Sequence, residues 1–158
     1  MKTFKKIIEE LVKQKKTIAT MESCTGGGVA NAITNIEGAS DVLKYSAVTY
    51  SNEYKIKMGV TKETIDTFSV YSMETARNMA EAISDFAKAN IGVGITGKLN
   101  RVDKNNPYGE DNVVFLCIFD KDKNEYYESK VEAIKSSRKL NKDLVIEKII
   151  EIIEKNVL

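Results

Sequence analysis

Residues 17–28, Thr-Ile-Ala-Thr-Met-Glu-Ser-Cys-Thr-Gly-Gly-Gly, decide the fold of this chain. A short β-branched run is followed by small polar residues, then by three glycines and a helical pattern. The stretch therefore predicts a strand, a tight turn and a helix N-terminus. Such a turn directs backbone N–H groups at one point, where we expect an anionic group to bind. A turn that needs glycine only for its backbone shape is the simpler alternative.

The composition sets the class of protein. The chain has 158 residues with 24 basic and 23 acidic side chains, so we expect one domain over residues 1–158 and no nucleic-acid partner. No apolar stretch is long enough to span a membrane, and the N-terminus reads as an amphipathic helix rather than a signal peptide. Cys24 and Cys117 lie far apart in sequence, which is typical of reduced thiols in a cytoplasmic protein.

The chain contains no histidine. This excludes Ser-His-Asp and Cys-His catalysis and any histidine-ligated metal, and we expect neither a metal nor a cofactor. A proton acceptor near neutral pH must then be a lysine, carboxylate, tyrosine or cysteine with a shifted pKa.

Hydrophobic periodicity predicts alternating helices and strands. Helices are predicted over 4–12, 25–33, 52–57, 61–67, 72–86 and 136–155, and strands over 17–21, 45–50, 91–97, 113–119 and 125–131. This order predicts a three-layer α/β/α sandwich with a mixed, mostly parallel central sheet. Three strands end in polar stretches, at 22–25, 50–52 and 96–97, and parallel strands would bring these ends to one pocket.

Four motifs carry a resemblance to a known family. They are Glu-Ser-Cys-Thr-Gly-Gly at 22–27, Gly-Ala-Ser at 38–40, Val-Thr-Tyr-Ser-Asn-Glu-Tyr-Lys at 48–55 and Ile-Thr-Gly at 95–97. In order and spacing the chain resembles the CinA C-terminal domain family, in its stand-alone form. The resemblance implies an α/β/α fold that forms homodimers or other homo-oligomers. It also implies an amidohydrolase of pyridine nucleotide salvage, which converts nicotinamide mononucleotide to nicotinate mononucleotide and ammonia.

The resemblance also implies a set of catalytic residues. The family's active-site serine, tyrosine and lysine fall on Ser40, Tyr50 and Lys55. We expect Ser40 as the nucleophile, Lys55 as a general base whose pKa is lowered by burial, and Tyr50 to orient the lysine or relay the proton. A helix cap at Ser40 and an exposed charge at Lys55 are the alternatives, and the choice of nucleophile stays open between Ser40, Ser23 and Cys24.

Other positions are expected to bind the nucleotide. Arg138 matches a family arginine that would hold the phosphate, and Lys142 replaces the next family arginine with a weaker phosphate partner. The remaining expected substrate-binding residues are Glu22, Ser23, Thr25, Gly26, Gly27, Thr96 and Gly97.

The chain departs from the family after Gly97, where large charged residues at 98–106 replace a glycine-rich loop. Either Lys98 or Arg101 grips the phosphate there, or the domain is an inactive or redirected nucleotide-binding module. A third hypothesis is an amidohydrolase that uses Cys24, activated at a helix N-terminus and helped by Glu22 and a lysine. The fourth is a purely structural or partner-binding domain.

Overall fold

The computed structural model describes residues 2–100, 105 and 111–158. Six α-helices and a short 3-10 helix occur in these ranges. They are α1 (Lys5–Gln14), α2 (Gly28–Thr34), η1 (Ala39–Asp41), α3 (Asn52–Lys57), α4 (Lys62–Phe68), α5 (Met73–Ala87) and α6 (Arg138–Asn156). The strands are β1 (Ile18–Glu22), β2 (Leu43–Val48), β3 (Ile91–Gly97), β4 (Val113–Asp120) and β5 (Glu125–Glu132).

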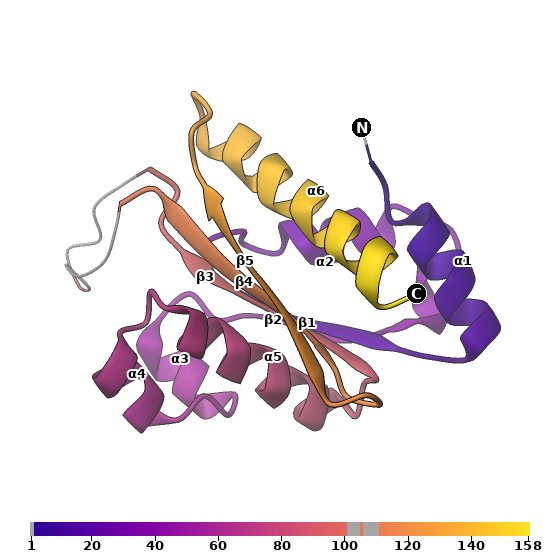
Figure 1. Cartoon of the computed structure of the whole chain (residues 1–158), viewed down its shortest axis with the longest axis horizontal. Coiled ribbons are helices and arrows are strands. Elements are labelled where there is room, and N and C mark those ends of the chain that lie inside the picture. Colours follow the sequence, from indigo (N-terminus) through magenta and orange to yellow (C-terminus); the bar gives the residue numbers. More distant parts are fainter. Residues whose placement is uncertain (1, 101–104, 106–110) are drawn as a thin grey trace.

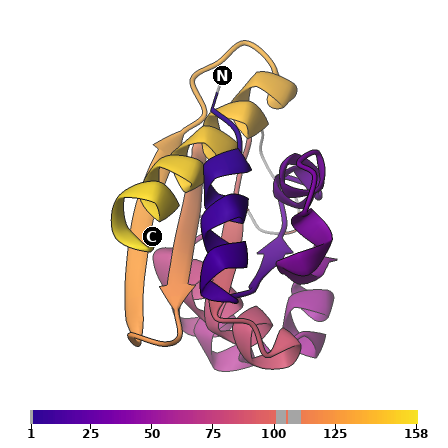
Figure 2. The same cartoon turned by 90° about the vertical axis from the view of Figure 1, so that its right-hand side faces the viewer.

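The strands form one mixed sheet in the order β2-β1-β3-β4-β5. β2, β1 and β3 run parallel, whereas β4 is antiparallel to β3 and β5 is antiparallel to β4. Helices α1, α2 and α6 cover one face and α3, α4 and α5 the other (Figures 1 and 2). The predicted α/β/α sandwich is confirmed.

Each face of the sheet packs a hydrophobic core. The larger core joins α1, α2 and α6 to the sheet through residues such as Ile8, Ile33 and Ile149. On the opposite face, Met79 and Ile83 of α5 pack against Ala19 and Met21 of β1. Every residue of β1 and β3 is buried, because helices cover both faces of these strands (Figure 1). In the described ranges, no helix is long and apolar enough to cross a membrane.

Two glycines of β3 set the distance between the sheet and α5. A methyl group on Gly92 would overlap the carbonyl oxygen of Ala80, and one on Gly94 would overlap that of Ala76. The helix backbone therefore lies directly on the strand, in the space that side chains would otherwise occupy.

Two predicted boundaries were wrong. The predicted helix over 25–33 begins only at Gly28, because Gly26 and Gly27 have left-handed φ angles of +61° and +95°. The predicted strand over 45–50 runs from Leu43 to Val48, and the chain leaves the sheet before Tyr50.

Replacing Gly94 with alanine tests the close packing of α5 on β3. We expect Gly94→Ala to lower the free energy of unfolding by about 1–3 kcal/mol, because the new methyl group forces strand and helix apart. Urea denaturation measures the change. Gly28→Ala is the control, because there the methyl group meets only the flexible end of Ile146. Equal stability of the two variants would contradict this account of the packing.

Candidate functional site

The candidate site lies at the carboxyl ends of β1, β2 and β3. Lys55, on α3, is only 2% exposed, and its amine reaches back to the end of β1. There its Nζ donates to the Ser23 hydroxyl at 3.0 Å and to the Thr49 carbonyl at 2.7 Å. A buried amine beside a serine hydroxyl is a pair that can transfer a proton and create a nucleophile without histidine.

Local structure positions both partners. The Ser23 amide donates to the Ile95 carbonyl at 3.1 Å, and the Thr49 amide donates to the Glu22 carbonyl at 2.8 Å. These bonds extend the sheet just past the strand ends. The Ser51 side chain caps α3 by accepting from the Tyr54 amide. Lys55 is the buried residue of that short helix.

Glu22 has a different role from the expected one. Its buried carboxylate accepts from the amides of Val29 and Ala30, both at 2.9 Å, and from the Thr25 hydroxyl at 2.6 Å. The anion at the start of α2 is therefore the chain's own carboxylate, which stabilises the helix N-terminus. Neither Glu22 nor the Thr25 hydroxyl points to a substrate as predicted, since each already bonds the other.

The structure does not bring Ser40 to Lys55. Ser40 lies in η1, before β2, whereas Thr49, which binds the Lys55 amine, follows the other end of that strand. β2 has six residues, and an extended strand of that length separates its ends by about 20 Å. Leu43 pairs with Ile18 and Val48 with Glu22, so Ser40 lies near the amino ends of these parallel strands and Ser23 at their carboxyl ends. Within this chain, Ser23 takes the place that was predicted for Ser40.

Two basic side chains of α6 lie near the site. The Arg138 guanidinium donates to the Tyr50 hydroxyl at 3.4 Å and to the Leu99 carbonyl at 3.3 Å. One turn further, the Lys142 amine lies over the glycine turn, 3.5 Å from the point where a Cβ on Gly26 would be. Together they place two positive charges beside the turn, where an anionic group is expected.

The far wall of the predicted pocket is structural. The buried Thr96 hydroxyl donates to the Val70 carbonyl at 2.9 Å, and a Cβ on Gly97 would overlap the backbone of β4. Thr96 and Gly97, which were expected to line the pocket and bind the substrate, therefore also hold β3 in place, and the Thr96 hydroxyl is already bonded within the chain.

Lys98 does not extend into solvent, where it was expected to bind the phosphate. Its buried amine pairs with Asp111 at 3.3 Å and lies 4.9 Å from the centre of the Tyr71 ring. Arg101, the other predicted phosphate partner, lies outside the described residues, as does most of the loop at 98–106.

Two cavities flank the basic residues of α6. One of about 470 Å³ lies between α2 and α6 and reaches Gly26, Gly27 and Lys142. Another of about 230 Å³ is lined by Leu99, Asn100 and Arg138, with part of the chain that leads into α6. They provide room for a charged ligand at this end of the molecule.

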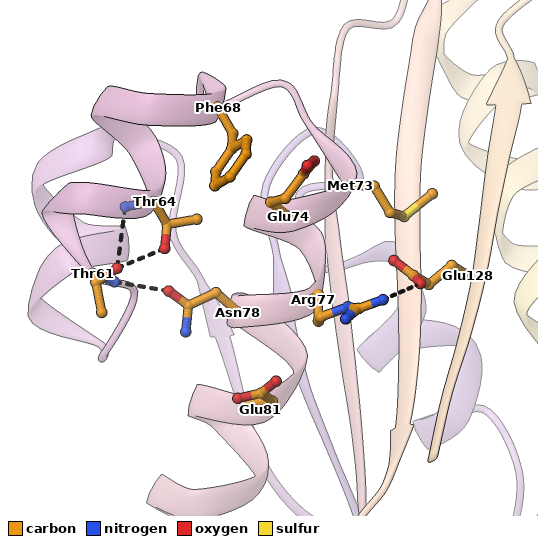
Figure 3. Close-up of a pocket in the computed structure, with 9 residues that line it drawn as sticks. All are labelled: Thr61, Thr64, Phe68, Met73, Glu74, Arg77, Asn78, Glu81 and Glu128. Carbon is orange, nitrogen blue, oxygen red and sulfur yellow. Dashed lines mark hydrogen bonds and ion pairs between the residues drawn. The ribbon is translucent and has the colours of Figure 1, made fainter. Parts of the chain in front are cut away.

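A separate cavity of about 560 Å³ lies between α4, α5 and β5 (Figure 3). Its polar groups largely satisfy one another. Arg77 pairs with Glu128 at 2.5 Å, and the Asn78 side chain accepts from the Thr61 amide (Figure 3). Glu81 accepts from the Tyr126 hydroxyl at 2.6 Å. Burial is the larger cause and this hydrogen bond the second, and together they raise the pKa of Tyr126 to about 12. These pairs give the cavity no activated nucleophile.

The sequence analysis did not identify Thr49 as a site residue, and it did not choose Ser23 as the partner of Lys55. The Thr49 hydroxyl is buried beside the site and has no hydrogen-bond partner within the described ranges, which leaves it available to a ligand. Its position after a strand, among other polar residues, was the signal that could have identified it. Ser23 was assigned to binding, although it directly follows the buried strand β1.

Comparison with known proteins supports one family. The family model described as the CinA C-terminal domain matches residues 1–157. A CinA-like protein of Endomicrobium trichonymphae is 40% identical over 120 residues, covering 74% of this chain but 27% of the relative. A Clostridium perfringens protein named for competence and damage induction is 51% identical over 88 residues, covering 55% of this chain and 21% of the relative. The chain thus spans about a quarter of the length of these relatives.

Solved structures show the same fold. The competence/damage inducible protein CihA from Agrobacterium tumefaciens superimposes with a TM-score of 0.84 at 28% identity, covering 95% of this chain and 90% of that one. A CinA superfamily protein from Enterobacter cloacae gives a TM-score of 0.81 at 24% identity, over 95% and 88% of the two chains. At that identity the second similarity concerns the fold alone.

The environment of Cys24 argues against a cysteine nucleophile. Burial raises the pKa of this thiol to about 12, although the positive charges of Lys55 and Arg138 act in the opposite direction. Burial likewise raises the pKa of Cys117 to about 12. Both groups are therefore protonated thiols at neutral pH and are poor nucleophiles.

We expect the native protein to react slowly with a thiol reagent at pH 8, and both cysteines to react quickly once urea unfolds the chain. Absorbance of the released chromophore measures both rates. Rapid modification of one thiol in the folded protein, preventable by Cys24→Ala, would contradict the predicted protonation of Cys24.

The carboxylate of Glu22 can be tested without an activity assay. Glu22→Gln replaces one acceptor oxygen by an NH₂ group and leaves an amide at the start of α2 without a partner. We expect a loss of about 1–3 kcal/mol in the free energy of unfolding. Urea denaturation measures it, with the exposed Glu37→Gln as the matched control. Unchanged stability in Glu22→Gln would show that the carboxylate does not hold α2.

Proposed function

The chain belongs to the CinA C-terminal domain family, and on that premise we propose that it hydrolyses the carboxamide of nicotinamide mononucleotide. The products would be nicotinate mononucleotide and ammonia. The observation that carries this proposal is the 3.0 Å hydrogen bond between the Lys55 amine and the Ser23 hydroxyl, in a protein without histidine.

The proposed reaction has two halves. In the first, Ser23 Oγ attacks the carboxamide carbon while the neutral Lys55 amine takes the hydroxyl proton. The protonated amine then stabilises the nearby negative charge and returns the proton to the departing nitrogen, which leaves as ammonia. In the second half, water attacks the ester on Ser23, Lys55 again accepts a proton, and the serine hydroxyl is restored as nicotinate mononucleotide leaves.

The basic residues of α6 support an anionic substrate. Arg138 is near the rim, bound to the Tyr50 hydroxyl, and the Lys142 amine lies over the glycine turn. We assign the nucleotide phosphate to these two cations. Tyr50 is 64% exposed and lies next to Arg138, so its proposed role is to position the guanidinium and cover the sugar. Such a nucleotide is a metabolite of the cytoplasm, where the proposal also places the protein.

Substitution at Ser23 and Lys55 tests the proposed chemistry. We expect Ser23→Ala and Lys55→Met each to reduce kcat for ammonia release from nicotinamide mononucleotide by at least about 10³-fold, because the nucleophile or its base is lost. Lys57→Met, on the same helix but exposed, is the matched control and keeps its activity. A coupled assay for ammonia measures the rates.

Two other results would contradict the proposal. Ammonia release by Ser23→Ala at the wild-type rate would exclude Ser23 as the nucleophile. If the nucleotide raised the melting temperature of the wild-type protein but released no ammonia, the chain would be a binding module instead.

A further inference from the structure

The side chain of Thr49, at the carboxyl end of the sheet, has a role that the fold does not explain. Thr49 is 2% exposed, and its Oγ1 atom is buried without a hydrogen-bond partner in the part of the chain that the structure describes. The backbone of the same residue is engaged, because its amide donates to the Glu22 carbonyl and its carbonyl accepts from the Lys55 amine. A buried hydroxyl without a partner costs stability, so its presence calls for a reason outside the fold.

Thr49 points to the same face of the sheet as Ser23. The residues before them, Val48 and Glu22, are paired in the parallel ladder of β2 and β1. The Val48 side chain lies next to the glycine turn before α2, and the Glu22 carboxylate accepts hydrogen bonds from α2, so both point to the α2 side. Because successive side chains of an extended chain alternate, Thr49 and Ser23 point to the other side, where Lys55 lies.

Ser23 lies between two threonines on this face. The register of β2, β1 and β3, continued by the backbone bonds just past the strand ends, places Thr49 on one side of Ser23 and Thr96 on the other. Neighbouring strands are about 4.8 Å apart, so each threonine is one strand away from the serine. The Thr96 hydroxyl is already used, because it donates to the Val70 carbonyl at 2.9 Å. Of these two threonines, Thr49 is the one whose hydroxyl is left for a ligand.

The Lys55 amine shows which part of a ligand would meet this hydroxyl. It lies between the two neighbouring residues, 3.0 Å from the Ser23 hydroxyl and 2.7 Å from the Thr49 carbonyl. A ligand atom that reaches the amine therefore also comes close to Thr49. In the proposed reaction that atom is the carboxamide nitrogen, which must receive a proton from Lys55 before it leaves as ammonia. The Thr49 hydroxyl is thus on the side of Ser23 where the leaving nitrogen has to lie.

We propose that the Thr49 hydroxyl accepts an N–H of the substrate's carboxamide, and so selects a carboxamide over a group of the same shape that has no N–H. The inference rests on the proposed function, because it takes the group that Ser23 attacks to be a carboxamide. A carboxamide has two N–H donors, and the hydroxyl oxygen offers one of them an acceptor that the described chain does not use. The hydrogen bond holds the nitrogen beside the Lys55 amine, in position to receive the proton.

Binding measured without turnover tests this selection. In the Ser23→Ala chain, titration calorimetry compares nicotinamide mononucleotide with 3-acetylpyridine mononucleotide, in which a methyl group replaces the NH₂. We expect the carboxamide to bind at least about tenfold more tightly, because a ligand without the N–H leaves the buried hydroxyl unpaired. Adding Thr49→Val removes the hydroxyl and reduces this preference to below about threefold, whereas adding Thr49→Ser keeps both the hydroxyl and the preference.

Two results of this titration would overturn the proposal. One is a preference for the carboxamide that is as large with Thr49→Val as without it. The other is a preference that Thr49→Ser loses as fully as Thr49→Val does, because the hydroxyl would then not be its cause.

Stability shows whether the hydroxyl serves the fold instead. We expect Thr49→Val to leave the melting temperature unchanged or to raise it, because the Thr49 hydroxyl has no described hydrogen bond to lose. Thr96→Val is the matched comparison: it removes a hydroxyl one strand from Ser23 that is bonded within the chain, and its melting temperature should fall. Scanning fluorimetry measures both. An equal fall in the two variants would assign the Thr49 hydroxyl to the fold and overturn the proposal.

Ammonia release separates this inference from the proposed function. We expect Thr49→Val to lower kcat/KM for nicotinamide mononucleotide at least about tenfold, and Thr49→Ser to keep it within about threefold. Turnover by Thr49→Val at the wild-type rate would overturn the role of Thr49 and leave the reaction of Ser23 and Lys55 intact. If the wild-type chain released no ammonia but Thr49 still selected the carboxamide in the titration, the reaction would be contradicted and the binding role supported. Absence of binding by either nucleotide would overturn both.

Discussion

The buried carboxylate of Glu22 is the constraint on which the site depends. By accepting three hydrogen bonds from the turn and the start of α2, it fixes the path of the chain directly after β1. Ser23 is the next residue, so the same bonds determine where its hydroxyl lies. They also fix the start of α2, which packs on the sheet beside α6, and Lys142 of α6 lies over the glycine turn. One internal anion thus organises both the proposed nucleophile and the proposed phosphate region.

In the proposed reaction, Lys55 does the work that imidazole does in many hydrolases, and the fold places its amine beside a serine hydroxyl. The Lys55 amine is enclosed, and it donates to the Ser23 hydroxyl and to the Thr49 carbonyl. The nearest carboxylate on the adjoining strand, Glu22, is already engaged by α2. The proposed proton acceptor, Lys55, is therefore kept apart from the structural anion, Glu22, although both lie at the end of β1.

The fold was largely predictable because each buried strand and amphipathic helix has a periodicity of its own. This periodicity predicted the order of the elements and the α/β/α layers. The predicted start of α2 was too early, because Gly26 and Gly27 have left-handed φ angles and precede the helix. The site was less predictable. Ser40 and Lys55 lie close in sequence, but β2 runs between them, so they lie at opposite ends of that strand. Thr96 was expected to contact the substrate. The hydrogen bond that its hydroxyl donates to the Val70 carbonyl could not be foreseen, because Val70 lies in a loop distant in sequence. Partners so far apart in sequence are set by the tertiary fold.

The direct contact between α5 and β3 has a consequence for how the protein adapts to ligands. At Gly92 and Gly94 the strand lies against the backbone of the helix, so a change of side-chain rotamer cannot alter the spacing at these two points. We expect the middle of the molecule to act as a stiff plate, whose strand ends hold the groups of the proposed reaction at a fixed spacing. Adjustment to ligands of different shape is left to segments that leave the plate, above all the turn before α3 and the first turn of α6. Variation in specificity between relatives should therefore concentrate in those segments rather than in the strands.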